Sequence, residues 1–327
     1  MTSTRSDAQT KTHTAAVIYN PIKVDLDVIK AAVSAEQNAA GWNETLYFAT
    51  SVEDVGQGVA RQALEAGADL VIVAGGDGTV RAVAEILHES SARLALIPSG
   101  TGNLLARNLE FTLDDVEHSV KTAFTGVERA VDVGLIDIRH GDGSLTKHAF
   151  VVMAGLGLDA KMLANTDDKL KAKVGWLAYV SAIAKALRDK SELRTRYRLD
   201  GGRTKSVRAH TIIIGNCGSL QANVLLLPDA VVDDGLFDIA VMRPEGVFGW
   251  LQVLVKVFWE NGVLRRTKLG EKLTTPEVRA LKYAKAARIT MRLGSAEEIE
   301  LDGDNIGEAT AIKARVKPRA LQMMVPR

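Results

Sequence analysis

One short stretch, residues 70–87, constrains the fold more than any other part of the chain. It opens with an apolar run typical of a buried strand and ends in periodic apolar residues that predict a helix. Between the two stand Gly75, Gly76, Asp77, Gly78 and Thr79. Glycines let the backbone approach an anion closely, and the first N–H groups of a helix point toward it. The stretch therefore predicts a phosphate-binding turn between a strand and a helix.

The turn differs from the two commonest phosphate loops. It has neither the Lys-Ser/Thr pair of a P-loop nor the glycine spacing of dinucleotide-binding turns. Asp77 stands in its middle and would repel a bare phosphate. We therefore expect Asp77 to contact a Mg²⁺ ion or a nucleotide hydroxyl. The alternative is a tight turn in which Asp77 caps the helix.

Apolar strands alternate with helical patterns in the first third of the chain. Strands are expected at 15–19, 45–49, 70–74 and 93–97, with helices at 24–40, 55–66 and 80–87. This alternation predicts an α/β fold with a doubly wound parallel sheet. The loops after the four strands begin at Asn20, Thr50, Gly75 and Ser99. We expect them to gather at one edge of the sheet, where ligands bind in such folds.

Short alternating strands replace this pattern further along the chain. They are expected at 131–138, 148–153, 194–199, 209–214, 237–242, 288–292 and 298–301, with one or two more within 311–325. They predict a second, mainly antiparallel domain, interrupted by helical patterns at 170–187 and 248–259. We expect a first domain at 14–134 joined by 315–327, a β-rich domain at 135–314, and a flexible tail at 1–13.

Composition excludes several classes of protein. The net charge of the 327 residues is +1, which gives no electrostatic reason to expect a nucleic-acid partner. The single cysteine, Cys217, excludes an internal disulfide and fits a reducing compartment. No apolar run approaches the ~20 residues of a membrane-spanning helix. We therefore expect a cytoplasmic protein that contacts the inner membrane surface only peripherally.

Two acid-rich turns lie late in the chain. Asp302 and Asp304 flank a glycine, and in a strand this spacing would put both carboxylates on one face. One of them could accept a proton while the other holds Mg²⁺ or orients its partner. The turn at 231–236 contains Asp233 and Asp234 and offers hard oxygen ligands. For both turns the alternative is an ordinary solvated turn.

In order and spacing these pieces resemble the bacterial diacylglycerol and lipid kinases, a family that includes sphingosine and ceramide kinases. The matching pieces are 20–21, 75–79, 98–103, 155–160, 228–230, 233–238 and 301–304. The resemblance covers the chain from Asn20 to Pro326. It implies an NAD-kinase-like nucleotide domain, a β-sandwich domain for the lipid, and phosphorylation of a lipid hydroxyl by ATP and Mg²⁺.

The resemblance also implies roles for individual residues. The nucleotide contacts fall on Asn20, Pro21, Thr50, Gly75, Gly76, Asp77, Gly78, Thr79, Thr101 and Asn103. Asp302 is expected to be the catalytic base and Asp304, where the family usually has Glu, a metal or nucleotide contact. A structural Mg²⁺ is expected on the carboxylate of Asp234 and the carbonyls of Val231 and Leu236. For the threonines, ordinary helix capping is an equal alternative.

The resemblance favours diacylglycerol as substrate and phosphatidic acid as product. A sphingoid-base kinase and an NAD kinase are alternatives. A nucleotide-binding regulatory protein without catalysis is another, because Asp304 stands where the family has Glu. A homodimer is also left open.

Two helical stretches could meet the lipid. The first combines cations with aromatic residues, which suits an anionic membrane surface, although a solvated lysine face is the plainer interpretation. Its residues are Lys169, Lys171, Lys173, Trp176 and Tyr179. The second could line an acyl-chain cleft, although such stripes are more often core. Its residues are Phe248, Trp250, Phe258 and Trp259.

Overall fold

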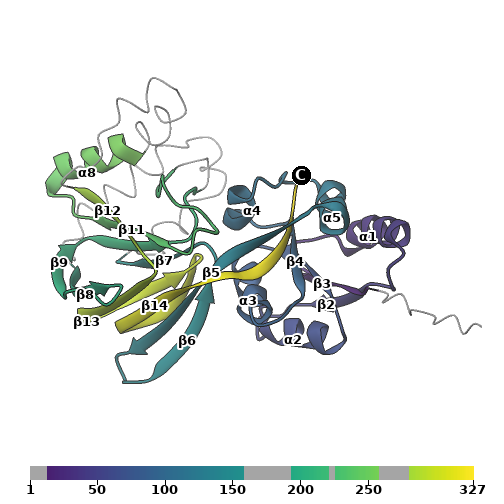
Figure 1. The fold of residues 1–327 in the computed structure, drawn as a ribbon, viewed down its shortest axis with the longest axis horizontal. Coiled ribbons are helices and arrows are strands. Elements are labelled where there is room, and N and C mark those ends of the chain that lie inside the picture. The colour runs from purple at the N-terminus through teal and green to yellow at the C-terminus, as the bar shows by residue number, and fades with distance from the viewer. Residues whose placement is uncertain (1–12, 158–192, 221–224, 258–279) are drawn as a thin grey trace, which may run out of the picture.

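A computed structural model of the chain describes residues 13–157, 193–220, 225–257 and 280–327 (Figure 1). The described strands form one sheet whose main path runs β12-β11-β10-β7-β13-β14-β4-β3-β1-β2. The expected tail at 1–13, apart from its last residue, and the expected helix at 170–187 lie outside the described residues.

The first part of the chain folds as the parallel, doubly wound sheet that the sequence predicts. Its strands are β1 (Ala15–Tyr19), β2 (Leu46–Ala49), β3 (Leu70–Gly75) and β4 (Arg93–Pro98), and they pair in parallel in the order β2-β1-β3-β4. Its helices are α1 (Leu26–Ala40), α2 (Gln57–Glu65), α3 (Asp77–Leu87), α4 (Leu104–Asn108) and α5 (Val116–Thr125).

Helices cover both faces of this sheet (Figure 1). Side chains alternate along each strand, so neighbouring positions face opposite helices. Val17 and Ile72 pack in one core with residues of α1 and α5, whereas Ile18 and Val73 pack in another with residues of α2 and α3. This two-sided burial accounts for the almost continuous apolar strands seen in the sequence.

Helix boundaries follow local capping. The side chain of Asp25 accepts N–H bonds from Asp27 and Val28, and α1 ends at Gly41 with φ +68°. Helix α3 begins at Asp77, three residues before the expected start at Val80, so the glycine turn itself supplies its first turn.

The second part of the chain is mainly antiparallel, as expected. Its strands are β5 (Val127–His140), β6 (Leu145–Phe150), β7 (Met153–Leu156), β8 (Leu193–Leu199), β9 (Lys205–Ala209), β10 (Thr211–Gly215), β11 (Phe237–Met242), β12 (Leu281–Ala286), β13 (Arg288–Leu301) and β14 (Asp304–Val325). The rings of Phe150 and Phe237 stack at 5.4 Å in its core. Helix α8 (Gly246–Leu254) covers part of the expected helix at 248–259, whose last two residues lie outside the described residues.

Two long strands, β5 and β14, connect the parallel and antiparallel parts of the sheet (Figure 1). Strand β14 pairs with β13 and β5, and near its end Met323 pairs in parallel with Leu94 of β4. The strands expected at 288–292 and 298–301 are one strand, β13, and the region 311–325 belongs to the single strand β14. The domain limits expected from the sequence stay a prediction.

Two expected strands are broken in the structure. The strand expected at 209–214 divides at His210 into β9 and β10. The strand expected at 148–153 divides at Val151 and Val152 into β6 and β7. None of the described helices is long and apolar enough to cross a membrane.

Candidate active site

The loops that follow the parallel strands gather at one edge of the sheet, as the sequence predicts. Tyr19 pairs with both Ala49 and Ala74, so the loops after β1, β2 and β3 begin side by side. The N–H of Asn20 donates to Ala74 at 3.0 Å, and the N–H of Thr50 donates to Tyr19 at 2.9 Å. These bonds hold the start of each loop against its neighbour.

The glycine turn packs tightly against the loop after β4. A Cβ atom on Gly100 would lie 2.6 Å from Cα of Gly76, so neither loop could approach the other with a side chain in between. Asn103 closes its own loop, accepting the N–H of Gly100 and donating to its carbonyl, both at 2.8 Å. The ammonium of Lys23 lies 3.3 Å from the Cβ position of Gly76. A cation therefore stands at the N-terminus of α3, the end of a helix that attracts anions.

Asp77 makes a contact that the sequence did not indicate. Its Oδ1 accepts the N–H of Leu104 at 2.6 Å, so it caps the neighbouring helix α4, whereas α3 receives no side-chain cap. Burial raises the pKa of this carboxyl, and N–H groups at the start of α4 partly offset the rise. The contact explains how an acid fits within this turn. A nucleotide contact by Asp77 stays a prediction.

The other expected nucleotide residues differ in exposure. Thr50 and Thr79 are buried, whereas Pro21 and Thr101 are exposed. A Cβ atom on Gly75 would lie 2.9 Å from that of Thr79, which packs beneath the turn. Their roles toward a nucleotide stay predictions.

Asp302 and Gly303 form a tight hairpin turn between β13 and β14. Leu301 pairs with Asp304, and the two turn residues have φ +50° and +91°. These values suit a two-residue hairpin whose twist matches its strands. The expectation that both carboxylates share one strand face is wrong, because the chain reverses direction between them.

The carboxylate of Asp302 points into the protein. It accepts the N–H groups of Val151, Val152 and Met153 at 2.8, 2.9 and 2.8 Å. This explains the break between β6 and β7, since these amides bind a side chain instead of a strand. Burial raises the pKa of Asp302 to about 6, while the three N–H groups and Arg81 act in the opposite direction.

The carboxylate of Asp304 points instead at α3. Nε and Nη2 of Arg81 donate to its Oδ2 at 3.1 and 2.9 Å. Both carboxylate oxygens lie 2.9 Å from where a Cβ atom on Gly78 would stand. The glycine turn and the late acidic turn therefore meet. The Asp304 side chain is 43% exposed, whereas that of Arg81 is 6% exposed and also pairs with Glu85 at 3.4 Å.

The partner of Arg81 was not predicted from the sequence. The position of Arg81 three residues after Gly78 on a helix could have indicated that partner, because residues at this spacing share a helix face. A helix that presents its first turn to a carboxylate must present Arg81 to the same carboxylate.

Lys285 of β12 brings a cation of the protein's own to the acid-rich turn at 231–236 and the residues that flank it. The ammonium of Lys285 lies 2.6 Å from the carbonyl oxygen of Asp229, and 3.0 and 3.4 Å from carboxylate oxygens of Asp238 and Asp234. The second oxygen of Asp234 accepts the N–H of Leu236 at 3.0 Å. Within the described residues no group of three or more acidic, histidine or cysteine side chains could hold a metal. A structural Mg²⁺ on Val231, Asp234 and Leu236 stays a prediction.

Asp132, which the sequence did not single out, fixes this turn to β14, the strand that returns to the parallel part of the sheet. Its two oxygens accept the N–H groups of Gly235 and Arg319 at 2.6 and 2.7 Å, and the residue is fully buried. The turn at 231–236 is thereby held against β14.

Only part of the aromatic stripe expected around 248–259 is described. Phe248 is 81% exposed, and the ring of Trp250 meets His210 edge-on at 5.0 Å. Phe258 and Trp259 lie outside the described residues, as do the last three residues of the matching piece at 155–160 and the lysines expected on a membrane-facing helix.

Comparison with known protein families decides the identity of this architecture. Residues 14–136 match the diacylglycerol kinase catalytic domain, and residues 151–325 match the YegS C-terminal NAD kinase beta sandwich-like domain. The chain belongs to the diacylglycerol and YegS-like lipid kinase family. The resemblance inferred from the short sequence pieces is thus confirmed.

Individual relatives agree with this family. The diacylglycerol kinase of Bacillus subtilis strain 168 is 26% identical over 295 residues, covering 89% of each chain. A Pseudomonas syringae pv. syringae protein named "Probable lipid kinase YegS-like" is 32% identical over 227 residues, 68% of this chain and 70% of that protein.

Solved structures share the fold. A diacylglycerol kinase of Bacillus anthracis superposes with a TM-score of 0.66 at 20% identity, covering 97% of this chain and 98% of the other. Yeast NADH kinase superposes with a TM-score of 0.55 at 8% identity, covering 98% and 84%. The expected fold, an NAD-kinase-like parallel domain with a β-sandwich, is confirmed.

Proposed function

We propose that this kinase transfers the γ-phosphoryl group of ATP, with Mg²⁺, to a lipid hydroxyl, and that diacylglycerol is the substrate and phosphatidic acid the product. Family membership supports a lipid kinase. The observation that carries the proposal is the meeting of Asp304 with Gly78, which puts a carboxylate beside a helix N-terminus suited to phosphate.

The residues of these loops suit a nucleoside triphosphate. Lys23 adds a positive charge at the α3 N-terminus, and glycines at 75, 76 and 78 keep side chains out of the turn. When bound, ATP with Mg²⁺ supplies the phosphoryl group and part of the charge neutralisation that its transfer needs. The protein positions the phosphates and excludes side chains from their path.

The geometry favours Asp304 over Asp302 as the base. Asp302 is buried and its carboxylate accepts three backbone N–H bonds, so a substrate hydroxyl has no approach to it. Asp304 is partly exposed, and Arg81 holds its Oδ2. Within the described residues no hydrogen bond reaches its Oδ1, which is the oxygen we assign to the hydroxyl proton. Asp302 then positions the hairpin that presents Asp304.

A substrate panel tests the proposal. The purified protein is incubated with Mg²⁺ and ATP labelled at the γ-phosphate, together with diacylglycerol in mixed micelles, sphingosine, or NAD. We expect label in phosphatidic acid. Label in NADP or in a sphingoid phosphate would overturn the substrate assignment. ATP binding without any labelled product would instead favour the regulatory alternative. Peripheral membrane contact, a cytoplasmic location and a homodimer belong to the same proposal.

A further inference from the structure

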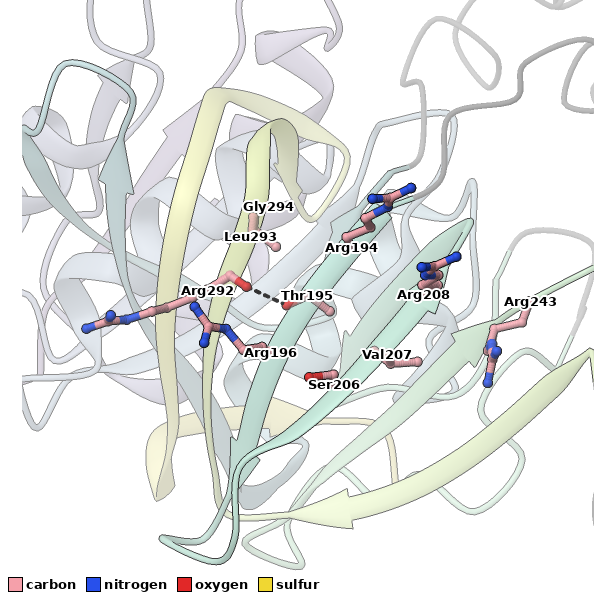
Figure 2. Close-up of a pocket in the computed structure, with 10 residues that line it drawn as sticks. All are labelled: Arg194, Thr195, Arg196, Ser206, Val207, Arg208, Arg243, Arg292, Leu293 and Gly294. Atoms are coloured by element: carbon pink, nitrogen blue, oxygen red, sulfur yellow. Dashed lines mark hydrogen bonds between the residues drawn. The ribbon is translucent and has the colours of Figure 1, made fainter.

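An arginine-rich groove lies on the antiparallel part of the sheet, and its described lining includes none of the carboxylates discussed above (Figure 2). It has a volume of about 510 Å³ and is formed by β8, β9, β13 and the residue that follows β11. Its exposed basic residues are Arg194, Arg196, Arg208, Arg243 and Arg292. We call it the arginine groove.

Strand register concentrates these charges. Arg292 of β13 pairs directly with Arg196 of β8, and Arg194 of β8 pairs directly with Arg208 of β9. Like charges directly opposite each other on a sheet are destabilising. Buried and exposed residues alternate along β8, so Arg194 and Arg196 share one exposed face. Arg194 and Arg208 have further interactions within the protein, whereas the like charges of Arg196 and Arg292 stand side by side, and an anionic ligand would relieve the repulsion of this pair.

The lining favours a phosphate-bearing surface over a soluble nucleotide. Guanidinium groups bind phosphate oxygens through two parallel N–H bonds. Besides arginines, the described lining contains only small polar and aliphatic residues, such as Ser206 and Val207. It therefore has no aromatic ring on which a base could stack. Charge without such a ring matches lipid headgroups, which present many phosphates in one plane.

We propose that the arginine groove docks the protein on an anionic lipid bilayer by binding the phosphate groups of its headgroups. This inference deepens the proposed function, because it says how the enzyme would reach a substrate that resides in a bilayer. Basic residues near an anionic membrane act roughly additively, each worth about a fivefold change in binding. The effect falls as salt rises.

Vesicle co-sedimentation without ATP tests the groove independently of kinase activity. The full-length protein is mixed with vesicles of phosphatidylglycerol and phosphatidylcholine in equal parts, and with pure phosphatidylcholine vesicles. We expect salt-sensitive binding to the first and none to the second. Arg196→Gln with Arg292→Gln should weaken binding by about 25-fold. A matched control, Arg61→Gln with Lys121→Gln, removes the same charge from exposed sites on α2 and α5 and should bind as the parent does.

A melting curve shows whether the groove variant folds. The variant removes both members of the facing Arg196–Arg292 pair and hence their repulsion, so its melting temperature should equal or exceed that of the parent. Equal loss in the control variant would overturn the proposal, because it would show a dependence on net charge alone. Binding of inorganic pyrophosphate that the groove variant loses, without any vesicle binding, would also overturn it in favour of a soluble anion.

Discussion

Arg81 and Asp304 stand 223 positions apart in the sequence, yet Nε and Nη2 of the arginine both bind Oδ2 of the aspartate. The arginine belongs to the helix that begins in the glycine turn, and the aspartate opens the last strand. This ion pair joins the nucleotide-type loops to the late acidic turn. We expect it to orient Asp304 toward the substrate hydroxyl.

The first prediction concerns this pair. Arg81→Lys keeps the charge but loses the planar fork that grips Oδ2, so kcat should fall about tenfold or more while ATP affinity changes little. A double-mutant cycle of Arg81→Met and Asp304→Asn should give a coupling energy of about 1–3 kcal/mol in unfolding free energy. Additive effects of the two changes would contradict an energetic link between them.

The second prediction concerns Gly78. Gly78→Ala places a methyl group 2.9 Å from both oxygens of Asp304, so the carboxylate must move. A displacement of the catalytic carboxylate by about 1 Å should lower kcat about 100-fold. Gly141→Ala is the matched control, because a Cβ atom there meets nothing within 4 Å. Equal activity of the two variants would show that the position of Asp304 does not matter.

Local patterns were enough to predict the parallel sheet, the order of its strands along the chain and the edge at which its loops gather, but not helices α4 and α5. Apolar runs such as 70–74 carry that information because burial on both faces makes them continuous. The contacts of Asp302 were not predictable in this way. Its partners at 151–153 are distant in sequence, and the same contacts break a strand that the local pattern predicts as continuous.

The third prediction concerns Asp302 and pH. Its pKa in the folded protein is about 6, above the ordinary value of about 3.9. Between these values the folded state binds more protons than the unfolded state, so this group makes stability fall as pH rises from about 4 through 6. The full change is about 3 kcal/mol. Asp302→Asn should remove that part of the slope.

Denaturant unfolding of both proteins from pH 4 to pH 7 measures this. The comparison isolates Asp302 from partly buried acids, such as Asp77 and Glu85, whose pKa values desolvation also raises. Parallel stability curves for the parent and Asp302→Asn would contradict the assigned direction.

The fourth prediction concerns Lys285. Lys285→Met leaves the carboxylates of Asp234 and Asp238 without their cation, and Asp238 is buried. The variant should lose about 2 kcal/mol of unfolding free energy. Because hard oxygen ligands suit Mg²⁺, millimolar Mg²⁺ should restore part of that loss in the variant. Lys282→Met, an exposed lysine on the same strand, is the control. A variant as stable as the parent would show that the ammonium is not needed.

At this turn the sequence allowed some residues to be predicted and not others. The family pieces located the acids at 233–238, but the partner Lys285 lies on a strand that the local pattern did not predict. Likewise, the like-charge pairs of the arginine groove exist only through strand register, which is set by pairing across the sheet and is invisible along the chain.

The most direct test of the account measures phosphoryl transfer and ATP binding together in the Asp304→Asn variant. With diacylglycerol in mixed micelles and ATP labelled at the γ-phosphate, Asp304→Asn should bind ATP as the parent does while forming phosphatidic acid at least 100-fold more slowly, a typical contribution of a general base. Undiminished product formation by Asp304→Asn would contradict the account.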